Sequence, residues 1–591
     1  MTINNRTIPS LVSNMPNNSK LKRLCVDSRR IGYLPEDNDV KFCLMSMAPY
    51  DGFQFSLGAD IVTAVLRDTD GIYCDHAVWM NTQFADILKQ CTGYYSGNSM
   101  RDFDIVGMSL YYVNSYYYIV PAMLRMGVHP LAAERSEKDP IICAGGGCMT
   151  TNPEPVADFF DFIFVGDAEG ILPKVLLDYD KSRMSKREYL QHLYDTYDCI
   201  YVPSLPMRTV TANRAKVEEI RLLAASDSTS KYWRKQIELI RGCKYSCRFC
   251  NLSWTRGSAR YLPAERVIEA ICTYPDDSGV QIYPFAPDES TYDKYEQIES
   301  VLGQRKLYRY NQRINTYYKR LSSNKHDSNV ALSTARIVHG IDGMSERCRK
   351  FIHKQVTDQQ IRHVLLHDLN HVREIKLNTI FAMPYESDSD VVEWENLIRW
   401  ACEERLKISG AALTGDYLKK WRGGRHDAVK MFKEDVCGDK LVMLNIAATP
   451  FQPEPQTPMQ WYDMPYSNRH RERFVSMMEK IKRDYCMVKY EGLNSVDNHR
   501  ASLILKRGDR SYSKYLLQCA IVRGRISEAI KHSKLINAVS KDHSVQELIG
   551  RISVDSALPW EFVNTNNGRK SLRDVFNTME KEAQKLFELK Q

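Results

Sequence analysis

The sequence predicts an α/β protein of three parts: a Rossmann-like domain over residues 40–200, a partial (β/α) barrel over residues 232–465 and a helical C-terminal region over residues 466–591. In the first two parts, apolar runs alternate with helical patterns, which is typical of parallel strands covered on both faces. In the first part several of these runs end in glycine, as strands do beside the ligand crevice of a doubly wound sheet.

The length and composition favour a large globular protein over a secreted or membrane protein. At 591 residues the chain is too long for one hydrophobic core, and its net charge of +8 permits a polyanionic partner without requiring one. No apolar run reaches about 18 residues, so we expect no membrane span. The 16 cysteines are sparse and scattered, which favours a reducing cytoplasm over a disulfide framework. Residues 1–39 are polar and lack the apolar stretch of a signal peptide, so we expect a flexible lead-in.

The first domain is predicted from apolar runs separated by one clear helical pattern. The helix is expected at residues 57–68, and the strands at residues 40–49, 104–110, 140–147 and 159–170. A run of three glycines, Gly145, Gly146 and Gly147, closes the third of these strands. Residues without a side chain let the backbone approach a ligand closely, so this loop is a candidate cofactor site, although a tight strand-to-helix turn explains it equally well. Cys148 follows as a functional thiol or, more simply, as a small buried residue.

A polar linker over residues 201–231 leads into the second alternating region. Strands are predicted there at residues 237–241, 280–285, 335–342 and 374–384, and helices at residues 263–274, 291–303 and 344–354. For residues 305–333 we expect one strand and an irregular helix. Repeated strand–helix units of this kind predict a partial (β/α) barrel.

Three cysteines directly follow the first of these strands. Cys243, Cys247 and Cys250 have the spacing Cys-x3-Cys-x2-Cys. Three thiolates can hold three irons of a cubane cluster, which leaves the fourth iron open to the amino and carboxylate groups of a small molecule. A structural zinc site or incidental buried thiols are the alternatives. Structural zinc usually takes a fourth ligand from a second cysteine pair, and the sequence has no second Cys-x2-Cys.

The motif resembles the signature of the radical S-adenosylmethionine (SAM) superfamily. The resemblance implies a [4Fe-4S] cluster on the three cysteines and places Phe249 near the adenine of SAM. It also implies that Asp288 or Glu289, in the segment Tyr283–Ser290, accepts hydrogen bonds from the SAM amino group.

Two further residues are candidates for SAM contacts through the same resemblance. Asp342 lies in a stretch similar to the family's Gly-x-Glu-Gly-x-Ser-x-Arg-Leu-Arg, where it replaces the usual glutamate. Arg320 is a candidate for the SAM carboxylate or ribose. Residues 305–320 interleave basic and aromatic side chains, as RNA-binding segments do, and a solvated barrel face explains them as well. The basic stretch Trp421–His426 is a candidate substrate loop or an ordinary connection.

Residues 144–170 resemble a more specific group, the radical SAM proteins with a cobalamin-binding domain, and the likeness extends over about residues 40–565. It implies that the Rossmann-like domain is of the cobalamin-binding type. The Asp-x-His-x-x-Gly motif that supplies histidine to cobalt in many such domains is missing, because Asp75 and His76 have the wrong spacing. Cobalamin therefore stays open as a cofactor.

The sequence thus predicts a cytoplasmic radical SAM enzyme with a [4Fe-4S] cluster and SAM. It would take electrons from a reductase or from a flavodoxin or ferredoxin, and abstract hydrogen from an unreactive carbon. With cobalamin, the expected outcome is methyl transfer. Two alternatives remain: a methylthiotransferase-like or other RNA-modifying radical SAM enzyme, and a non-enzymatic iron–sulfur or zinc module. The substrate is not specified, with RNA one candidate.

Overall fold

The computed structural model describes most of the chain between residues 35 and 588. The described residues are 35–36, 39–47, 57–78, 93, 96, 98–225, 234–274, 281–303, 309–323, 336–372, 374–408, 443–485, 487–522, 525–526, 530–565 and 569–588. Most of the expected lead-in, the first part of the basic–aromatic segment 305–320 and the stretch Trp421–His426 lie outside them.

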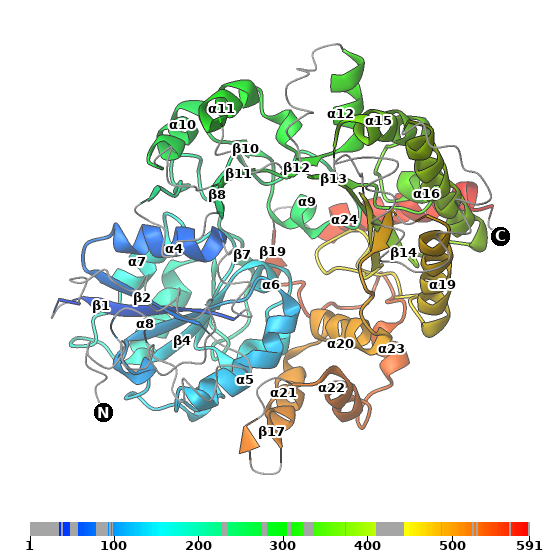
Figure 1. The fold of residues 1–591 in the computed structure, drawn as a ribbon. Coiled ribbons are helices and arrows are strands. Elements are labelled where there is room, and N and C mark those ends of the chain that lie inside the picture. Colours follow the sequence, from blue (N-terminus) through cyan, green and yellow to red (C-terminus); the bar gives the residue numbers. More distant parts are fainter. Residues whose placement is uncertain are drawn as a thin grey trace, which may run out of the picture.

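The first domain is built on a six-stranded sheet of order β2-β1-β3-β4-β5-β6 (Figure 1). Its strands are β1 (Val40–Ser46), β2 (Ile72–Val78), β3 (Ile105–Ser109), β4 (Ile141–Gly145), β5 (Phe162–Phe164) and β6 (Ile200–Tyr201). All neighbours are parallel except β5 and β6. Because β1 pairs with both β2 and β3, the strand order reverses there, which places a topological switch point at the carboxyl ends of β1 and β3.

Helices cover both faces of this sheet, as its sequence pattern requires. Along β1, Phe42 and Leu44 belong to one apolar cluster, and Cys43 and Met45 belong to another. The first cluster takes in α4 (Leu57–Arg67), α7 (Leu172–Leu177) and α8 (Lys186–Thr196), and the second takes in α5 (Tyr116–Arg125). The side chains of a strand alternate between its two faces, so this division shows a doubly wound, Rossmann-like domain. The predicted fold class is confirmed here.

The second region contains two parallel ladders. One pairs β8 (Arg234–Glu238) with β11 (Gln281–Phe285). The other runs in order through β12 (Arg309–Gln312), β13 (Arg336–Gly340), β14 (Glu374–Phe381), β15 (Met443–Pro450) and β16 (Val488–Tyr490). Between described residues no ladder joins β11 to β12, so a continuous barrel wall is not shown. The second ladder continues past residue 465 into the region that we expected to be mostly helical.

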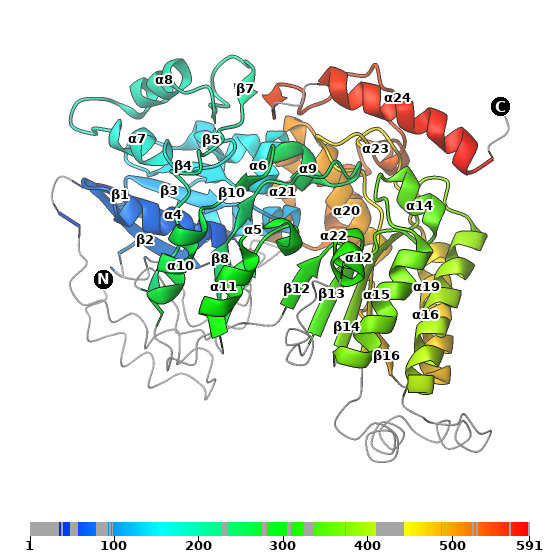
Figure 2. The ribbon, with the colours of Figure 1, turned by 90° about the horizontal axis from the view of Figure 1, so that it is seen from above.

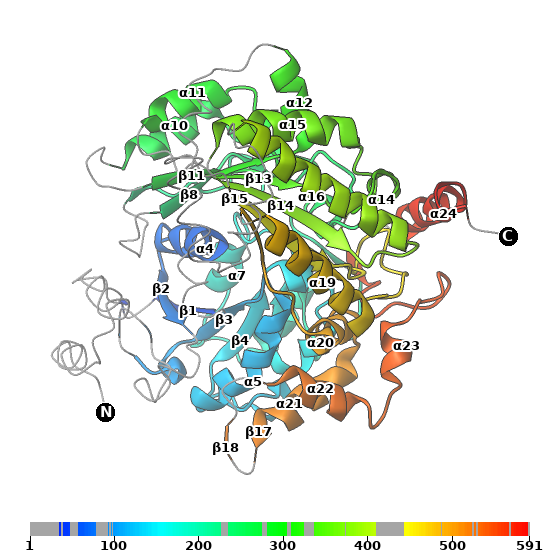
Figure 3. The same cartoon turned by 45° about the vertical axis from the view of Figure 1, so that its right-hand side comes forward.

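Helices pack along the outside of these strands. They are α10 (Ala264–Cys272), α11 (Tyr295–Leu302), α12 (Ile314–Ser322), α14 (Glu346–Phe351), α15 (Asp358–His371), α16 (Asp388–Ile408) and α19 (Asn468–Asp484). Figure 3 shows α15, α16 and α19 side by side over the sheet. In β14 the side chains of Ile375, Leu377, Thr379 and Phe381 are buried and their neighbours are only half-buried, which fits one face against helices and one toward a more open interior.

The C-terminal region connects the two halves (Figure 2). It contains α20 (Val496–Arg507), α21 (Ser513–Ala520), α22 (His532–Val539), α23 (Val545–Ile549), α24 (Arg569–Leu586) and the short strands β17 (Ile521–Val522), β18 (Arg525–Ile526) and β19 (Val563–Asn564). Helix α21 packs on α5 of the first domain, α24 packs on α14 of the second, and β19 pairs in parallel with β7 (Val210–Thr211) of the linker. Within the described part of the chain, no helix combines the length and apolar character needed to cross a membrane.

Candidate active site

The three cysteines lie on one loop between β9 (Ile240–Arg241) and the short helix α9 (Asn251–Thr255). Gly242 starts the loop with φ of +82°, and a Cβ there would stand 2.6 Å from the carbonyl oxygen of Ser258, so only glycine fits. Further on, the Cys250 amide donates to the Cys247 carbonyl at 3.1 Å and the Trp254 indole donates to the same carbonyl at 2.9 Å. These bonds fix the second half of the loop, which carries Cys247 and Cys250.

The thiols of this loop are close enough to affect one another. Cys247 is buried, and Cys243 and Cys250 are half-buried. Burial raises the pKa of Cys250, and the neighbouring Cys247 and Cys243 raise it further. Cysteines with such a pKa become ligands when a metal centre compensates their charge. Within the described residues no three His, Cys, Asp or Glu side chains converge on a single-ion position. A cubane cluster takes one thiolate per iron, so it spaces its ligands differently from a single-ion site.

An arginine that the sequence reasoning missed lies against this loop. The Arg313 guanidinium, at the start of α12, places Nη1 3.1 Å from Cys247 Sγ and lies 3.7 Å from the centre of the Tyr245 ring. Arg313 is only 9% exposed, its Nε lacks a hydrogen-bond partner, and no carboxylate of the described residues lies within ion-pair distance. A buried cation without an anion is costly, so this position fits a centre that brings negative charge onto Cys247. The expected Arg320 lies about two turns further along α12, and its side chain makes no hydrogen bond or ion pair with the described residues.

Asp288 and Glu289 lie directly after β11, at the carboxyl end of the strand. Asp288 is 2% exposed and accepts hydrogen bonds from three hydroxyls, of Tyr245 at 2.7 Å, Thr316 at 3.0 Å and Ser290 at 2.5 Å. Glu289 is 1% exposed and accepts from the Tyr295 hydroxyl at 3.0 Å. The structure thus brings Asp288 into contact with the cysteine loop through Tyr245, which lies between two of the cysteines.

The other two SAM candidates occupy different surroundings. Phe249 is half-buried and packs against an apolar cluster that includes Trp254, Phe351 and Trp461. Asp342 follows β13 with φ of +59°, and its carboxylate pairs with the Lys354 ammonium. Asp342 therefore already has a cationic partner.

The glycine run ends β4 and begins the short helix α6 (Gly147–Thr151). A Cβ on Gly146, whose φ is +110°, would stand 2.7 Å from the Leu110 carbonyl oxygen, so close backbone packing requires glycine there. A Cβ placed on Gly145 or Gly147 would stand 3.8 Å from its nearest neighbour, so close packing does not require glycine at those two positions. Met149 is fully buried and Tyr111 is 49% exposed. Burial raises the pKa of the Cys148 thiol to about 12, as expected for an inert cysteine.

The motif Gly-Asp-x-Glu after β5 reaches both ends of the cysteine loop. Asp167 lies 3.1 Å from Arg256, 2.9 Å from Arg260 and 3.9 Å from Arg241, while Glu169 pairs with Arg241 at 2.6 Å. We call these five residues the Asp167 clamp. Arg241 immediately precedes Gly242, and Arg256 immediately follows α9. The clamp therefore attaches the start and the end of the cysteine loop to the first domain.

The pKa values of the two acids in the clamp are shifted in opposite directions. Burial by itself would raise the pKa of Asp167, but the three guanidiniums hold it below its ordinary value. Burial raises the pKa of Glu169, which the Arg241 guanidinium only partly offsets. Sequence reasoning singled out this stretch only as part of a family resemblance. Its partners lie 72 to 93 positions away, so no local pattern could reveal them.

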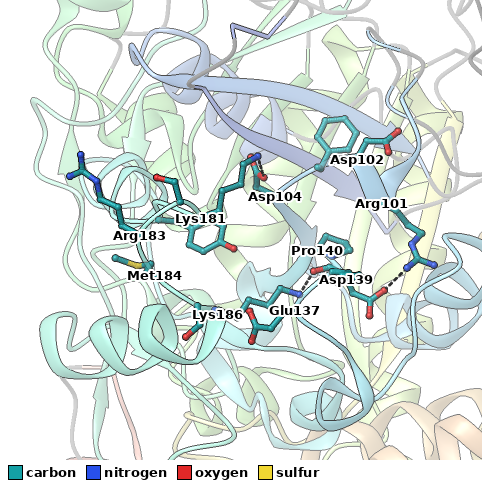
Figure 4. Close-up of a pocket in the computed structure, with 15 residues that line it drawn as sticks. Arg101, Asp102, Asp104, Glu137, Asp139, Pro140, Lys181, Arg183, Met184 and Lys186 are labelled. Atoms are coloured by element: carbon teal, nitrogen blue, oxygen red, sulfur yellow. Dashed lines mark hydrogen bonds and ion pairs between the residues drawn. The ribbon is translucent and has the colours of Figure 1, made fainter.

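A separate cavity of about 630 Å³ lies at the amino ends of β3 and β4, opposite the glycine run (Figure 4). Charged residues that line it form ion pairs with one another: Arg101 pairs with Asp139 at 2.9 Å, and Lys181 pairs with Asp104 at 2.8 Å. This cavity is not part of the site around the cysteines.

Comparison with known proteins supports the assignment suggested by the cysteine loop. Residues 237–398 match the family model of the radical SAM superfamily, and residues 58–203 match that of the N-terminal domain of radical SAM proteins. The chain therefore belongs to the radical SAM superfamily and is a radical SAM enzyme, a class whose cofactors are a [4Fe-4S] cluster and SAM. The predicted membership of the radical SAM superfamily is confirmed.

A curated relative and two solved structures are similar to the chain. The uncharacterized protein MJ0966 of Methanocaldococcus jannaschii is 21% identical over 463 residues, covering 76% of this chain and 86% of that protein. The cobalamin-dependent SAM radical enzyme OxsB, solved with aqua-cobalamin and SAM, aligns with a TM-score of 0.43 and 12% identity over 93% of this chain and 80% of its own. The radical SAM methyltransferase TsrM from Kitasatospora setae, solved with cobalamin and a [4Fe-4S] cluster, aligns with a TM-score of 0.39 and 12% identity over 93% of this chain and 99% of its own. At these TM-scores the likeness transfers no property to this chain.

Proposed function

We propose that Cys243, Cys247 and Cys250 bind a [4Fe-4S] cluster with which the protein cleaves SAM reductively and abstracts hydrogen from an unreactive carbon. The observation that supports this most directly is the Arg313 guanidinium, buried beside Cys247 with no carboxylate partner among the described residues. When bound, the cluster supplies one electron that splits SAM into methionine and a 5′-deoxyadenosyl radical, which takes a hydrogen atom from the substrate.

The chain's own residues hold and shield this site. The Gly242 turn and the amide and indole bonds to the Cys247 carbonyl fix the loop, and the Asp167 clamp holds its ends. Glu289, with Asp288 beside it at the end of β11, accepts hydrogen bonds from the SAM amino group in this proposal. The apolar cluster beneath Phe249 excludes water from one side of the loop. Electrons come from a reductase or from a flavodoxin or ferredoxin.

We further propose that the first domain binds cobalamin at the carboxyl ends of β1, β3 and β4, and that the reaction is then a methyl transfer. The doubly wound topology, the unconstrained Gly145 and Gly147 and the exposed Tyr111 support this. His76 does not suit a cobalt ligand, because its ring is buried against Thr63 of α4. Bound cobalamin would therefore lack a histidine ligand from this position.

Anaerobic reconstitution with iron and sulfide, followed by dithionite and SAM, tests the cluster. We expect about four irons per chain and release of 5′-deoxyadenosine, detected by mass spectrometry. Replacing each of the three cysteines with Ala should remove both, whereas Cys272→Ala, which alters an exposed cysteine on α10, should leave both unchanged. Retention of iron and SAM cleavage by the triple alanine variant would refute the proposal.

The same preparation distinguishes the remaining alternatives. Stoichiometric zinc in place of iron would establish a metal module instead of a radical enzyme. Hydroxocobalamin that stays bound after gel filtration, read from its visible spectrum, supports methyl transfer, and its complete loss contradicts it. Tight RNA binding that weakens steeply with salt would favour the RNA-modifying alternative.

A further inference from the structure

Arg313 is a buried cation whose guanidinium is fixed from two sides. Its Nη1 lies 3.1 Å from Cys247 Sγ, and its Cζ lies 3.7 Å above the Tyr245 ring, within the range of a cation–π interaction. Tyr245 belongs to the same loop as the cysteines. The guanidinium therefore packs against the loop through both a sulfur and a ring.

Asp288 holds this arrangement in place. It accepts from the Tyr245 hydroxyl at 2.7 Å and from the Thr316 hydroxyl at 3.0 Å. The same Thr316 hydroxyl lies 2.8 Å from the Arg313 carbonyl oxygen. One carboxylate thus orients both the ring beneath the guanidinium and the first turn of the helix that carries it.

A fixed positive charge beside a ligating sulfur has a definite effect on an iron–sulfur cluster. One-electron reduction adds negative charge to the cluster and its sulfurs. An N–H donor from a guanidinium stabilises that charge more strongly than it stabilises the oxidised state, because charge-assisted hydrogen bonds strengthen with the charge on the acceptor. Hydrogen bonds to cluster sulfurs are accordingly one of the means by which proteins set the reduction potential.

We propose that Arg313 is a positioning residue that raises the reduction potential of the cluster by donating a hydrogen bond to the Cys247 thiolate. The proposal rests on the proposed function, because it requires the cluster on Cys247. In this view Tyr245 and Asp288 hold the guanidinium against the sulfur, so that the centre is reduced more readily.

The test is a redox titration of the reconstituted cluster, followed by electron paramagnetic resonance, in wild type, Arg313→Gln and Arg313→Lys. We expect equal iron content in all three, a clearly more negative midpoint potential for Arg313→Gln and a smaller shift for Arg313→Lys, which keeps the charge but loses the planar stacking on Tyr245. Lys319→Gln, which removes an exposed charge from the same helix, is the matched control and should leave the midpoint unchanged. The Fe–S(Cys) stretching bands in resonance Raman spectra should also shift in Arg313→Gln, as expected when a hydrogen bond to sulfur is lost.

The outcomes separate the two proposals. A wild-type protein that takes up no iron refutes the proposed function. A wild-type cluster whose midpoint and Fe–S bands are unchanged in Arg313→Gln refutes only the role of Arg313. If Arg313→Gln fails to take up iron, Arg313→Lys decides: a midpoint equal to that of wild type, with wild-type Fe–S bands, overturns the proposal, and a negative shift supports it.

Discussion

Asp288 and Glu289 are adjacent buried carboxylates, and Asp288 is hydrogen-bonded to the cysteine loop. A carboxylate offers about four acceptor positions, and Asp288 already receives three hydroxyl donors. One of these comes from Tyr245, so a change at Asp288 would disturb the cysteine loop as well as any bound SAM. Glu289 is therefore the better position at which to test the SAM amino-group site.

We expect Glu289→Gln to weaken SAM binding by about 1.5–3 kcal/mol, because a charge-assisted hydrogen bond to the ammonium is lost. Iron content should stay at the wild-type level. Isothermal titration of the reconstituted protein with SAM measures the effect, with Glu296→Gln, an exposed glutamate on α11, as the control. An unchanged affinity would move the amino-group site to Asp288 or Asp342.

The residues of the site differ in how far a sequence can reveal them. The cysteines were predicted because their spacing is itself the requirement of the cluster. Arg313 was missed because its partner Cys247 lies 66 positions earlier, and nothing in the surrounding basic–aromatic segment distinguishes it from Arg320. The fold decides which of the two arginines meets the loop, because α12 begins at the end of β12, and only its first turn reaches the cysteines.

At the scale of elements, the strand-to-helix turn after β4 illustrates a local requirement. Gly146 has φ of +110° and ψ of −177°, a region that is almost exclusive to glycine. We expect Gly146→Ala to destabilise the protein by about 1–3 kcal/mol through backbone strain, and the clash with the Leu110 carbonyl adds to this. Thermal unfolding followed by circular dichroism measures the loss.

Gly147→Ala is the matched control for this turn. Its nearest neighbours stand 3.8 Å from the new Cβ, so its unfolding temperature should remain close to wild type. If cobalamin approaches this turn, Gly147→Ala should nevertheless reduce hydroxocobalamin retention. Equal destabilisation by the two substitutions would contradict the assignment of the strain to Gly146.

Most elements of the two sheets follow from their patterns, and the exceptions have physical reasons. β4 was predicted because it is a continuous apolar run that ends in glycine. β2 was not predicted, because Asp75 and His76 interrupt its centre, although both are buried. Their polar atoms are bonded within the fold, Asp75 to Ser96 and His76 to Thr63, and a sequence does not show such partners. β16 has only three residues, too few for any periodic signal.

At the scale of the whole molecule, the Asp167 clamp couples the first domain to the cysteine loop. Asp167→Asn would remove the buried carboxylate that pairs with Arg256 and Arg260, whereas Arg241 would keep Glu169 and Glu238. Breaking a buried ion pair in this way typically costs about 3–5 kcal/mol. We therefore expect a clearly lower unfolding temperature and faster loss of iron to a chelator, measured on the reconstituted protein by absorbance.

Lys181→Met provides the control for the clamp. Lys181 pairs with Asp104 at the exposed edge of the first domain, where its side chain is 60% accessible, so its loss should cost less than about 1 kcal/mol. Iron release at the wild-type rate in Asp167→Asn would show that the clamp joins the domains without supporting the loop.

The pairing of β7 with β19 has a consequence for the order in which the protein can be assembled. The two strands lie 353 positions apart, with the whole cysteine loop and the second sheet between them. A ribosome needs on the order of 20–70 s to synthesise that length. Throughout that interval the strand in the linker lacks its partner, while all the strands of the first sheet have already been synthesised. The newly made chain therefore passes through a stage in which its cysteine loop has been translated but the strand that closes the linker has not. If the loop binds the proposed cluster, iron–sulfur assembly has a defined period before closure.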